Sequence, residues 1–196
     1  ELIILDIDAS VNNLEPNYKM IAKLAAECRM PLCYGGGIKS LKQAKHIISL
    51  GVEKIAISSA ALEDDFIISN IANELGSQSV VVALDVRKKS TLFASTYKIY
   101  THNAERAHKN DLMEFIKYIE DSGAGEILIN SIDNDGQMRG YDVLLAKQIQ
   151  KEINIPMTFL GGAGSLEDMQ MLIKECGTIG VAAGSIFVFK GKYKAV

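Results

Sequence analysis

Short runs of apolar residues, rich in Ile, Val and Leu, alternate along the chain with segments whose apolar residues recur at helical spacing. Turn residues follow each run, so each run predicts a buried β-strand and each intervening segment a helix. The predicted strands are Leu2–Asp6, Leu32–Tyr34, Lys54–Ile57, Ser79–Asp85, Glu126–Asn130, Met157–Leu160 and Ile179–Ala183. The predicted helices are Tyr18–Arg29, Leu41–Leu50, Asp64–Leu75, Asp111–Ser122, Val143–Glu152 and Leu166–Glu175. Strands that are apolar on both faces and alternate with helices predict a parallel sheet, either open or closed into a barrel.

Local signals support this assignment. Ser40 and Ser165 stand directly before two predicted helices, where residues that cap a helix N-terminus belong. The alternation of predicted strands and helices is interrupted once, by the polar stretch Arg87–Asn110. This stretch contains a strand-like segment at Tyr97–Thr101. We expect a loop there, and a loop of that length in a compact domain is more often functional than idle.

The chain also contains an internal repeat at an offset of 125 residues. The matched positions are Pro31 with Pro156, Gly36 with Gly161, Gly37 with Gly162, Ser40 with Ser165 and Leu41 with Leu166. Two related halves predict a duplicated half-barrel. The first-half counterpart of Ser79–Asp85 would precede Glu1, so we expect seven of eight strands, with the first βα unit missing. A full barrel has roughly 250 residues, and we expect the last helix to be cut short at residues 194–196.

Composition narrows the class of protein. The 196 residues are 48% hydrophobic, enough for one core, so a single domain over residues 1–196 is expected. A net charge of −3 argues against a nucleic-acid partner, and the apolar runs are shorter than the roughly 18 residues of a membrane span. The chain opens without a secretory leader, which favours the cytoplasm. Three cysteines without a CxxC pair and three histidines without metal-ligand spacing indicate neither a disulfide framework nor a metal site, and no cofactor is expected.

Two glycine-rich loops are candidate phosphate sites. Gly35-Gly36-Gly37 follows one predicted strand, and Gly161-Gly162-Ala163-Gly164 follows its repeat partner. Glycine lets backbone N–H groups approach a phosphate, and the following helix N-terminus adds its positive dipole. The next strands end in small residues, so the candidate substrate-binding residues are Gly37, Ser58, Ser59, Gly162, Gly164, Ala183, Gly184 and Ser185. This pattern predicts a substrate with a phosphate at each end; the alternative is tight strand–helix turns that bind nothing.

Acidic residues follow several strands. Asp85 ends the most hydrophobic one, where a partly desolvated carboxylate is placed for general acid–base catalysis. Its alternative role is that of a structural partner for Arg87 or a lysine. Asp133 and Asp135 could hold ribose hydroxyls or share the catalysis, although the turn of Asp135 and Gly136 would by itself explain an aspartate. In the first half, Asp6 and Asp8 occupy the equivalent region.

The starts of three predicted strands carry charge. Glu1, Lys54 and Glu126 can point into the opposite end of a barrel and form a ring of two acids and a lysine there. The alternative is that they are ordinary solvated strand ends.

Taken together, these features resemble the cyclase subunit family of imidazole glycerol phosphate synthase over essentially the whole chain. The matching stretches are Leu5–Ile7, Gly35–Ile38, Gly76–Ala83, Gly123–Leu128, Gly161–Gly164 and, most specifically, Ser131–Gly136 with Gly140–Asp142. The resemblance implies a (βα)8 TIM barrel that takes ammonia from a glutaminase subunit on its N-terminal face. It further implies a lyase of histidine biosynthesis that closes an imidazole ring on a bis-phosphorylated substrate.

The resemblance also assigns roles. Asp85 matches one of two catalytic aspartates, and the other would lie on the missing strand. Asp135 matches a substrate-contacting acid, and Glu1, Lys54 and Glu126 match three of four charged residues at an ammonia entrance.

Departures from the family pattern leave an alternative open. They are Leu160, Gly184, His102–Glu105, Met30–Tyr34 and Phe187–Lys192. These departures resemble a paralogous branch that serves an ATP-dependent amidotransferase in acetamidino-sugar biosynthesis for surface glycans. Such a barrel would be an ammonia conduit rather than a cyclase. An unrelated phosphosugar isomerase on the same duplicated barrel fits less well, because the charged ring would then have no purpose.

Overall fold

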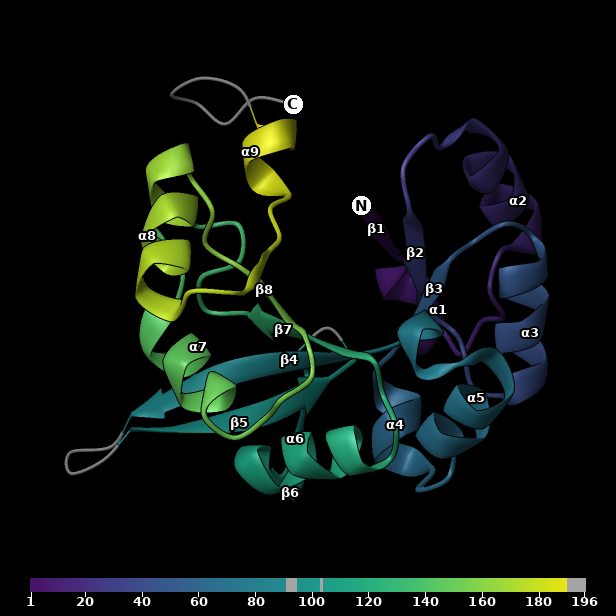
Figure 1. Cartoon of the computed structure of the whole chain (residues 1–196), viewed down its shortest axis with the longest axis horizontal. Coiled ribbons are helices and arrows are strands. Elements are labelled where there is room, and N and C mark those ends of the chain that lie inside the picture. The colour runs from purple at the N-terminus through teal and green to yellow at the C-terminus, as the bar shows by residue number, and fades with distance from the viewer. Residues whose placement is uncertain (91–94, 103, 190–196) are drawn as a thin grey trace.

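The computed structural model describes residues 1–90, 95–102 and 104–189, and its centre is a curled parallel sheet (Figure 1). The parallel strands are β1 (Leu2–Leu5), β2 (Leu32–Gly35), β3 (Lys54–Ile57), β4 (Val80–Ser90), β7 (Glu126–Ser131), β8 (Met157–Leu160) and β9 (Gly180–Val181). They pair in the order β1-β2-β3-β4-β7-β8-β9. The sheet curls so that β1–β3 stand on one side of β4 and β7, and β8 stands on the other (Figure 1). This half-barrel confirms the α/β class, and a unit preceding β1 stays a prediction.

Helices cover the outer face of the sheet. They are α2 (Tyr18–Glu27), α3 (Leu41–Ser49), α5 (Ile67–Leu75), α6 (Leu112–Asp121), α7 (Val143–Gln150) and α8 (Leu166–Cys176). Both predicted caps are confirmed: the Ser40 hydroxyl accepts from the backbone N–H of Gln43, and Ser165 forms a capping box with Asp168. Of the helices in the described ranges, none is long and apolar enough to cross a membrane.

Several short elements were not predicted. These are α1 (Ile7–Val11), α4 (Ser59–Glu63), the 3₁₀ turn Ser77–Ser79 and α9 (Ser185–Val188). The predicted helix Asp64–Leu75 begins later, as α5 at Ile67, and the predicted last strand shortens to the two residues of β9. The expected break of the last helix at residues 194–196 lies outside the described residues.

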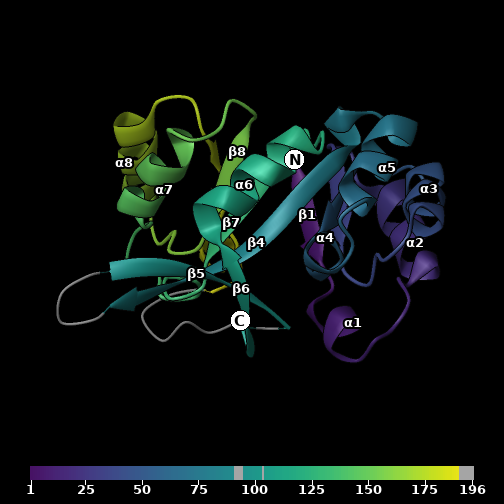
Figure 2. The same ribbon diagram turned by 90° about the horizontal axis from the view of Figure 1, so that it is seen from below.

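The expected loop over Arg87–Asn110 was wrong, although the strand-like segment Tyr97–Thr101 within it is confirmed as a strand. β4 continues to Ser90, and β5 (Ser95–Thr101) and β6 (Arg106–Asp111) add to it as antiparallel strands. The cause is an unpaired edge: β3 pairs with β4 only as far as Val82, which leaves the later part of β4 open on that side. β5 occupies this edge from Asp85 onward. Figure 2 shows β5 and β6 projecting beyond the rest of the sheet.

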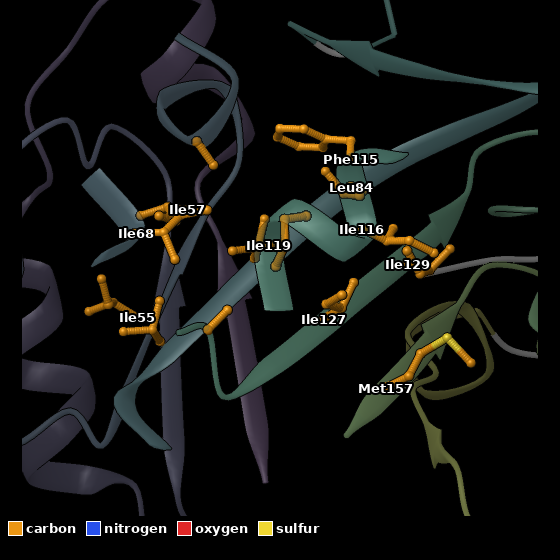
Figure 3. Close-up of a cluster of buried hydrophobic side chains, with 14 of the residues drawn as sticks. Ile55, Ile57, Ile68, Leu84, Phe115, Ile116, Ile119, Ile127, Ile129 and Met157 are labelled. Atoms are coloured by element: carbon orange, nitrogen blue, oxygen red, sulfur yellow. The ribbon is translucent and has the colours of Figure 1, made fainter. Parts of the chain in front are cut away.

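The two faces of the sheet carry different cores. On the outer face, large aliphatic side chains such as Ile55, Ile57, Ile127 and Ile129 pack against the helices. Figure 3 shows Ile119 of α6 lying between the isoleucines of β3 and those of β7. On the inner face, Cys33, Ala56, Val81 and Leu128 form a smaller cluster with Ile3, Ala83 and Leu160. Because successive side chains of a strand point to opposite faces, β1, β2, β3, β4, β7 and β8 each contribute to both cores.

The outer core should dominate stability. Ile119 is fully buried, whereas Ile173, also in a helix, is 49% exposed. We expect Ile119→Ala to lower the free energy of unfolding by about 2–5 kcal/mol, because it removes buried methyl groups and leaves a cavity. The matched change Ile173→Ala should cost less than about 1 kcal/mol. Urea unfolding followed by circular dichroism measures both, and equal losses would contradict this description of the core.

Candidate active site

A cavity of about 730 Å³ lies at the carboxyl ends of the parallel strands. Its wall is formed by the ends of β1, β2, β3, β4, β7 and β8 and by the segments that follow them. Strand-end residues on the wall are Leu5, Asp6, Ile57, Ser58, Asp85, Asn130 and Leu160. In parallel α/β folds, ligands bind at this end of the strands, so the cavity is the candidate active site.

Asp85 lies on the wall of this cavity, as the sequence predicted. Burial raises the pKa of its carboxyl group above the ordinary value, a hydrogen bond from Asn130 lowers it, and the charge of Asp135 raises it further. The alternative role as a partner for Arg87 is not what the structure has, because Arg87 Nε lies 3.4 Å from Asp133 Oδ1 and the guanidinium stacks on the Tyr100 ring. A carboxyl group with a raised pKa exchanges protons closer to neutral pH, which suits acid–base catalysis.

The other acidic candidates fall into two groups, those that line the cavity and one that is bonded to β4. Asp135 and Asp6 line the cavity, and Asp6 Oδ1 also accepts the backbone N–H of Ala9 at the start of α1. Asp133 instead accepts the backbone N–H of Lys88 at 2.8 Å and pairs with Arg87, so it anchors the extended part of β4. The carboxylate of Asp133 therefore has a structural role.

The first glycine loop belongs to the cavity. Gly36, Gly37, Ser58 and Ser59 all lie on its wall. A Cβ at Gly36 would stand 2.4 Å from the Asp6 carbonyl oxygen, and φ there is +117°, so the close approach of β1 and β2 requires glycine.

Lys39, which the sequence reasoning missed, also lines the cavity directly after this loop. Its ammonium group donates a hydrogen bond to Asn13 Oδ1. The other charged residues of the wall, Asp6, Glu63, Asp85 and Asp135, are acidic. A lysine that follows a GGGI sequence by one position is the signal that could have identified it.

The second glycine loop is placed differently. Its candidate residues Gly162, Gly164, Ala183, Gly184 and Ser185 are not on the wall of the cavity within the described residues, and neither is Gly136. A Cβ at Gly162 would lie 2.0 Å from the Gly140 carbonyl oxygen, and the Gly164 N–H already donates to Asp168 Oδ2 at 2.9 Å. Close packing explains Gly162 and Gly164 without a ligand.

The predicted ring of charges exists at the opposite ends of the strands. Lys54 Nζ donates to Glu1 Oε2 at 2.9 Å and to Glu126 Oε2 at 2.8 Å. Burial lowers the pKa of Lys54, but the hydrogen bonds to the two glutamates outweigh burial and raise it overall. Thr158, which carried no sequence signal, donates its hydroxyl to Glu126 Oε1 at 2.6 Å. Glu1, Lys54, Glu126 and Thr158 therefore form one connected set, here called the ion cluster.

The inner apolar cluster lies between the ion cluster and the cavity, because Ala56 and Leu128 each occupy the middle of a strand whose first residue belongs to the ion cluster. Burial and the two glutamates raise the pKa of the Cys33 thiol to about 12, so this side chain stays neutral. In the part of the chain that the structure describes, no group of three or more His, Cys, Asp or Glu side chains is arranged to hold a metal ion.

The raised pKa of Asp85 makes its ionisation oppose folding. This cost is absent below about pH 3, where the carboxyl group is protonated in both states, and is complete above the folded-state pKa. We therefore expect Asp85→Asn to unfold at a higher urea concentration than the unmodified protein at pH 8 and at the same concentration near pH 3. Asp65→Asn, at an exposed aspartate, is the control. An unchanged or lower midpoint for Asp85→Asn at pH 8 would contradict the assignment.

Comparison with known proteins places this geometry in context. A family model described as "Histidine biosynthesis protein" matches residues 1–194. A Leptospira borgpetersenii protein with the provisional name imidazole glycerol phosphate synthase subunit HisF is 54% identical over all 196 residues, which cover 76% of its own length. A provisionally named hisF3 protein of Vibrio vulnificus is 50% identical over the same residues, 75% of its length. Imidazole glycerol phosphate synthase subunit HisF of Prosthecochloris aestuarii is 37% identical over 190 residues, 97% of this chain and 74% of that protein.

Proposed function

The chain belongs to the histidine biosynthesis protein family, among the HisF subunits of imidazole glycerol phosphate synthase, and from this premise we propose that its cavity closes an imidazole ring with ammonia. The ammonia comes from a glutaminase partner, and the substrate is a ribosyl-aminoimidazole-carboxamide with a phosphate at each end. The observation that carries the proposal is the position of Asp85, a carboxyl group with a raised pKa on the wall of a cavity that also contains a glycine-rich loop.

Asp85 is the proposed acid–base residue. Ring closure requires proton removal from an attacking nitrogen and protonation of leaving groups, and a carboxyl group titrating nearer neutral pH serves both steps. Asp135 lies on the same wall and is proposed to hold a polar group of the substrate.

One phosphate is proposed to bind at the first glycine loop. Gly37, Ser58 and Ser59 supply small side chains and backbone N–H groups there, and Lys39 supplies a positive charge. The second phosphate is proposed to bind beside Gly162, Gly164, Ala183, Gly184 and Ser185. Because the first loop and Lys39 lie on the wall of the cavity and these second-loop residues do not, we expect the first site to contribute most of the phosphate affinity.

Ammonia is proposed to enter at the ion cluster. Glu1, Lys54 and Glu126 close the end of the sheet opposite the cavity, where the glutaminase subunit would dock. The inner apolar cluster, with Cys33, Ala56, Val81 and Leu128, would then line the path of a small neutral molecule to Asp85.

A second candidate function is an ammonia conduit that passes ammonia to a separate amidotransferase. Two observations favour it. Leu160, an apolar side chain, stands on the cavity wall beside the second glycine loop. The relatives at 48–54% identity carry provisional names, in two cases as numbered copies, whereas relatives named HisF without that qualifier are 37% identical.

Turnover with excess ammonium tests the proposal. The purified protein is given the bis-phosphorylated substrate, and formation of the imidazole product is followed with and without Asp85→Asn. Loss of a general acid–base residue should reduce kcat about 10²–10⁴-fold. If a folded protein that binds a glutaminase subunit shows no turnover at all, the conduit stands and the cyclase is excluded.

The phosphate site has its own prediction. Lys39→Met removes the positive charge beside the first glycine loop, so we expect KM for the phosphorylated substrate to rise roughly 10- to 100-fold, the worth of a charged hydrogen bond, with kcat changed much less. Lys42→Met, at an exposed lysine of α3 outside the cavity wall, should leave both constants unchanged. Equal behaviour of the two variants would show that the phosphate binds elsewhere.

A further inference from the structure

The partner of Asp85 across the sheet is Asn130. The parallel register of β4 and β7 sets the two residues opposite each other, and both lie on the cavity wall. Asn130 Nδ2 donates a hydrogen bond to Asp85 Oδ1 at 2.9 Å. This contact is produced by strand pairing between residues 45 positions apart in the chain, so it had no sequence signal.

In the part of the chain that the structure describes, no cation is paired with the Asp85 carboxylate. Among the described residues Asp85 forms no ion pair, because Arg87 is held by Asp133 and by the Tyr100 ring. Across β5 its neighbour is Tyr100, and the nearby charge that affects it is that of Asp135. Asn130 is the hydrogen-bond partner that the fold provides, and it is neutral.

The carbonyl oxygen of the Asn130 amide indicates that this side chain has a role beyond stabilising the fold. Its Oδ1 atom is buried without a hydrogen-bond partner, packed where a Cβ at Gly161 would stand 3.2 Å away. A buried unpartnered carbonyl destabilises a protein by about 1–3 kcal/mol. A leucine of similar volume would avoid that cost but would leave Asp85 without its donor.

We propose that Asn130 is a positioning residue for Asp85: its amide holds Oδ1 against β7 and leaves Oδ2 as the oxygen that exchanges a proton with the substrate. With Oδ1 held by an N–H group, the carboxyl group cannot rotate freely. Within the described residues Oδ2 has no protein partner, so it is the site where a substrate proton would be received and returned. The role of Oδ2 in catalysis rests on the proposed cyclase function. The positioning of Asp85 by its hydrogen bond with Asn130 does not depend on that function.

The test compares Asn130→Leu with Asn73→Leu, the same change at an exposed position of α5. Carboxyl ¹³C NMR of the free protein follows the titration of Asp85, which Asp85→Asn identifies. Loss of a hydrogen bond to the charged form should raise the pKa of Asp85 in Asn130→Leu, while Asn73→Leu should leave it unchanged. Urea unfolding confirms that each variant is folded.

Activity gives the second readout. With excess ammonium, Asn130→Leu should lower kcat about tenfold or more at neutral pH, with little change in KM. It should also shift the acidic limb of the profile of kcat against pH to higher pH. An unchanged Asp85 titration in Asn130→Leu overturns the inference whatever the activity. A raised Asp85 pKa in Asn130→Leu supports it, and if the unmodified protein then shows no turnover, the proposed cyclase function fails by itself.

Discussion

The pairing of β4 with β7 is the contact on which the rest of the structure depends, because it decides which side chains of these two central strands face the cavity and which face the helices. Six consecutive residue pairs, from Val81 with Glu126 to Val86 with Ser131, hold the strands in one parallel register. Side chains alternate between faces, so this register turns Leu128 inward and the isoleucines on either side of it outward to the helices. A shift of β7 by one residue would exchange its two faces and bury Glu126 and Asn130 among the helices.

Because of the same alternation, the charged side chains of the inner face lie at the two ends of the strands and not in their middle. On the inner face of β7, Glu126 lies at the start of the strand, Leu128 in its middle, and Asn130 near its end, beside Asp85. A charge in the middle would be desolvated without a partner, whereas at the strand ends Lys54 and Thr158 pair with Glu126 and the cavity admits water or substrate to Asp85. Four residues of strand span roughly 13 Å. The ion cluster and the candidate active site therefore lie at opposite ends of the inner apolar cluster.

Duplication has not produced two equivalent sites. Both glycine loops follow a strand and precede a serine-capped helix, yet the first lines the cavity and the second packs against residues 138–140. The N–H groups of the equivalent residues Lys39 and Gly164 are taken in the same way, by Gln43 and Asp168 at the third position of each helix. The physical difference is what lies against the glycines: Gly36 approaches Asp6 of the cavity wall, whereas Gly162 and Gly164 approach the carbonyl oxygens of Gly140 and Met138. Similar sequence signals thus acquire different environments.

Local chemistry was sufficient to predict much of this protein. Apolar runs and helical spacing identified all seven parallel strands and the six longer helices, and Ser40 and Ser165 were correct as caps, because these features depend on residues close in the chain. The charge at the starts of three strands and the aspartate after Ser79–Leu84 were also visible. The segment Tyr97–Thr101 was also identified as strand-like, and it forms β5. Its antiparallel pairing with β4 and the strand β6 were not predicted, since they form only because β3 ends early and leaves the edge of β4 open. Only the tertiary structure decided that Asn130 faces Asp85, that Thr158 joins the ion cluster and that Lys39 reaches the cavity, because strand register brings together residues that no spacing along the chain relates.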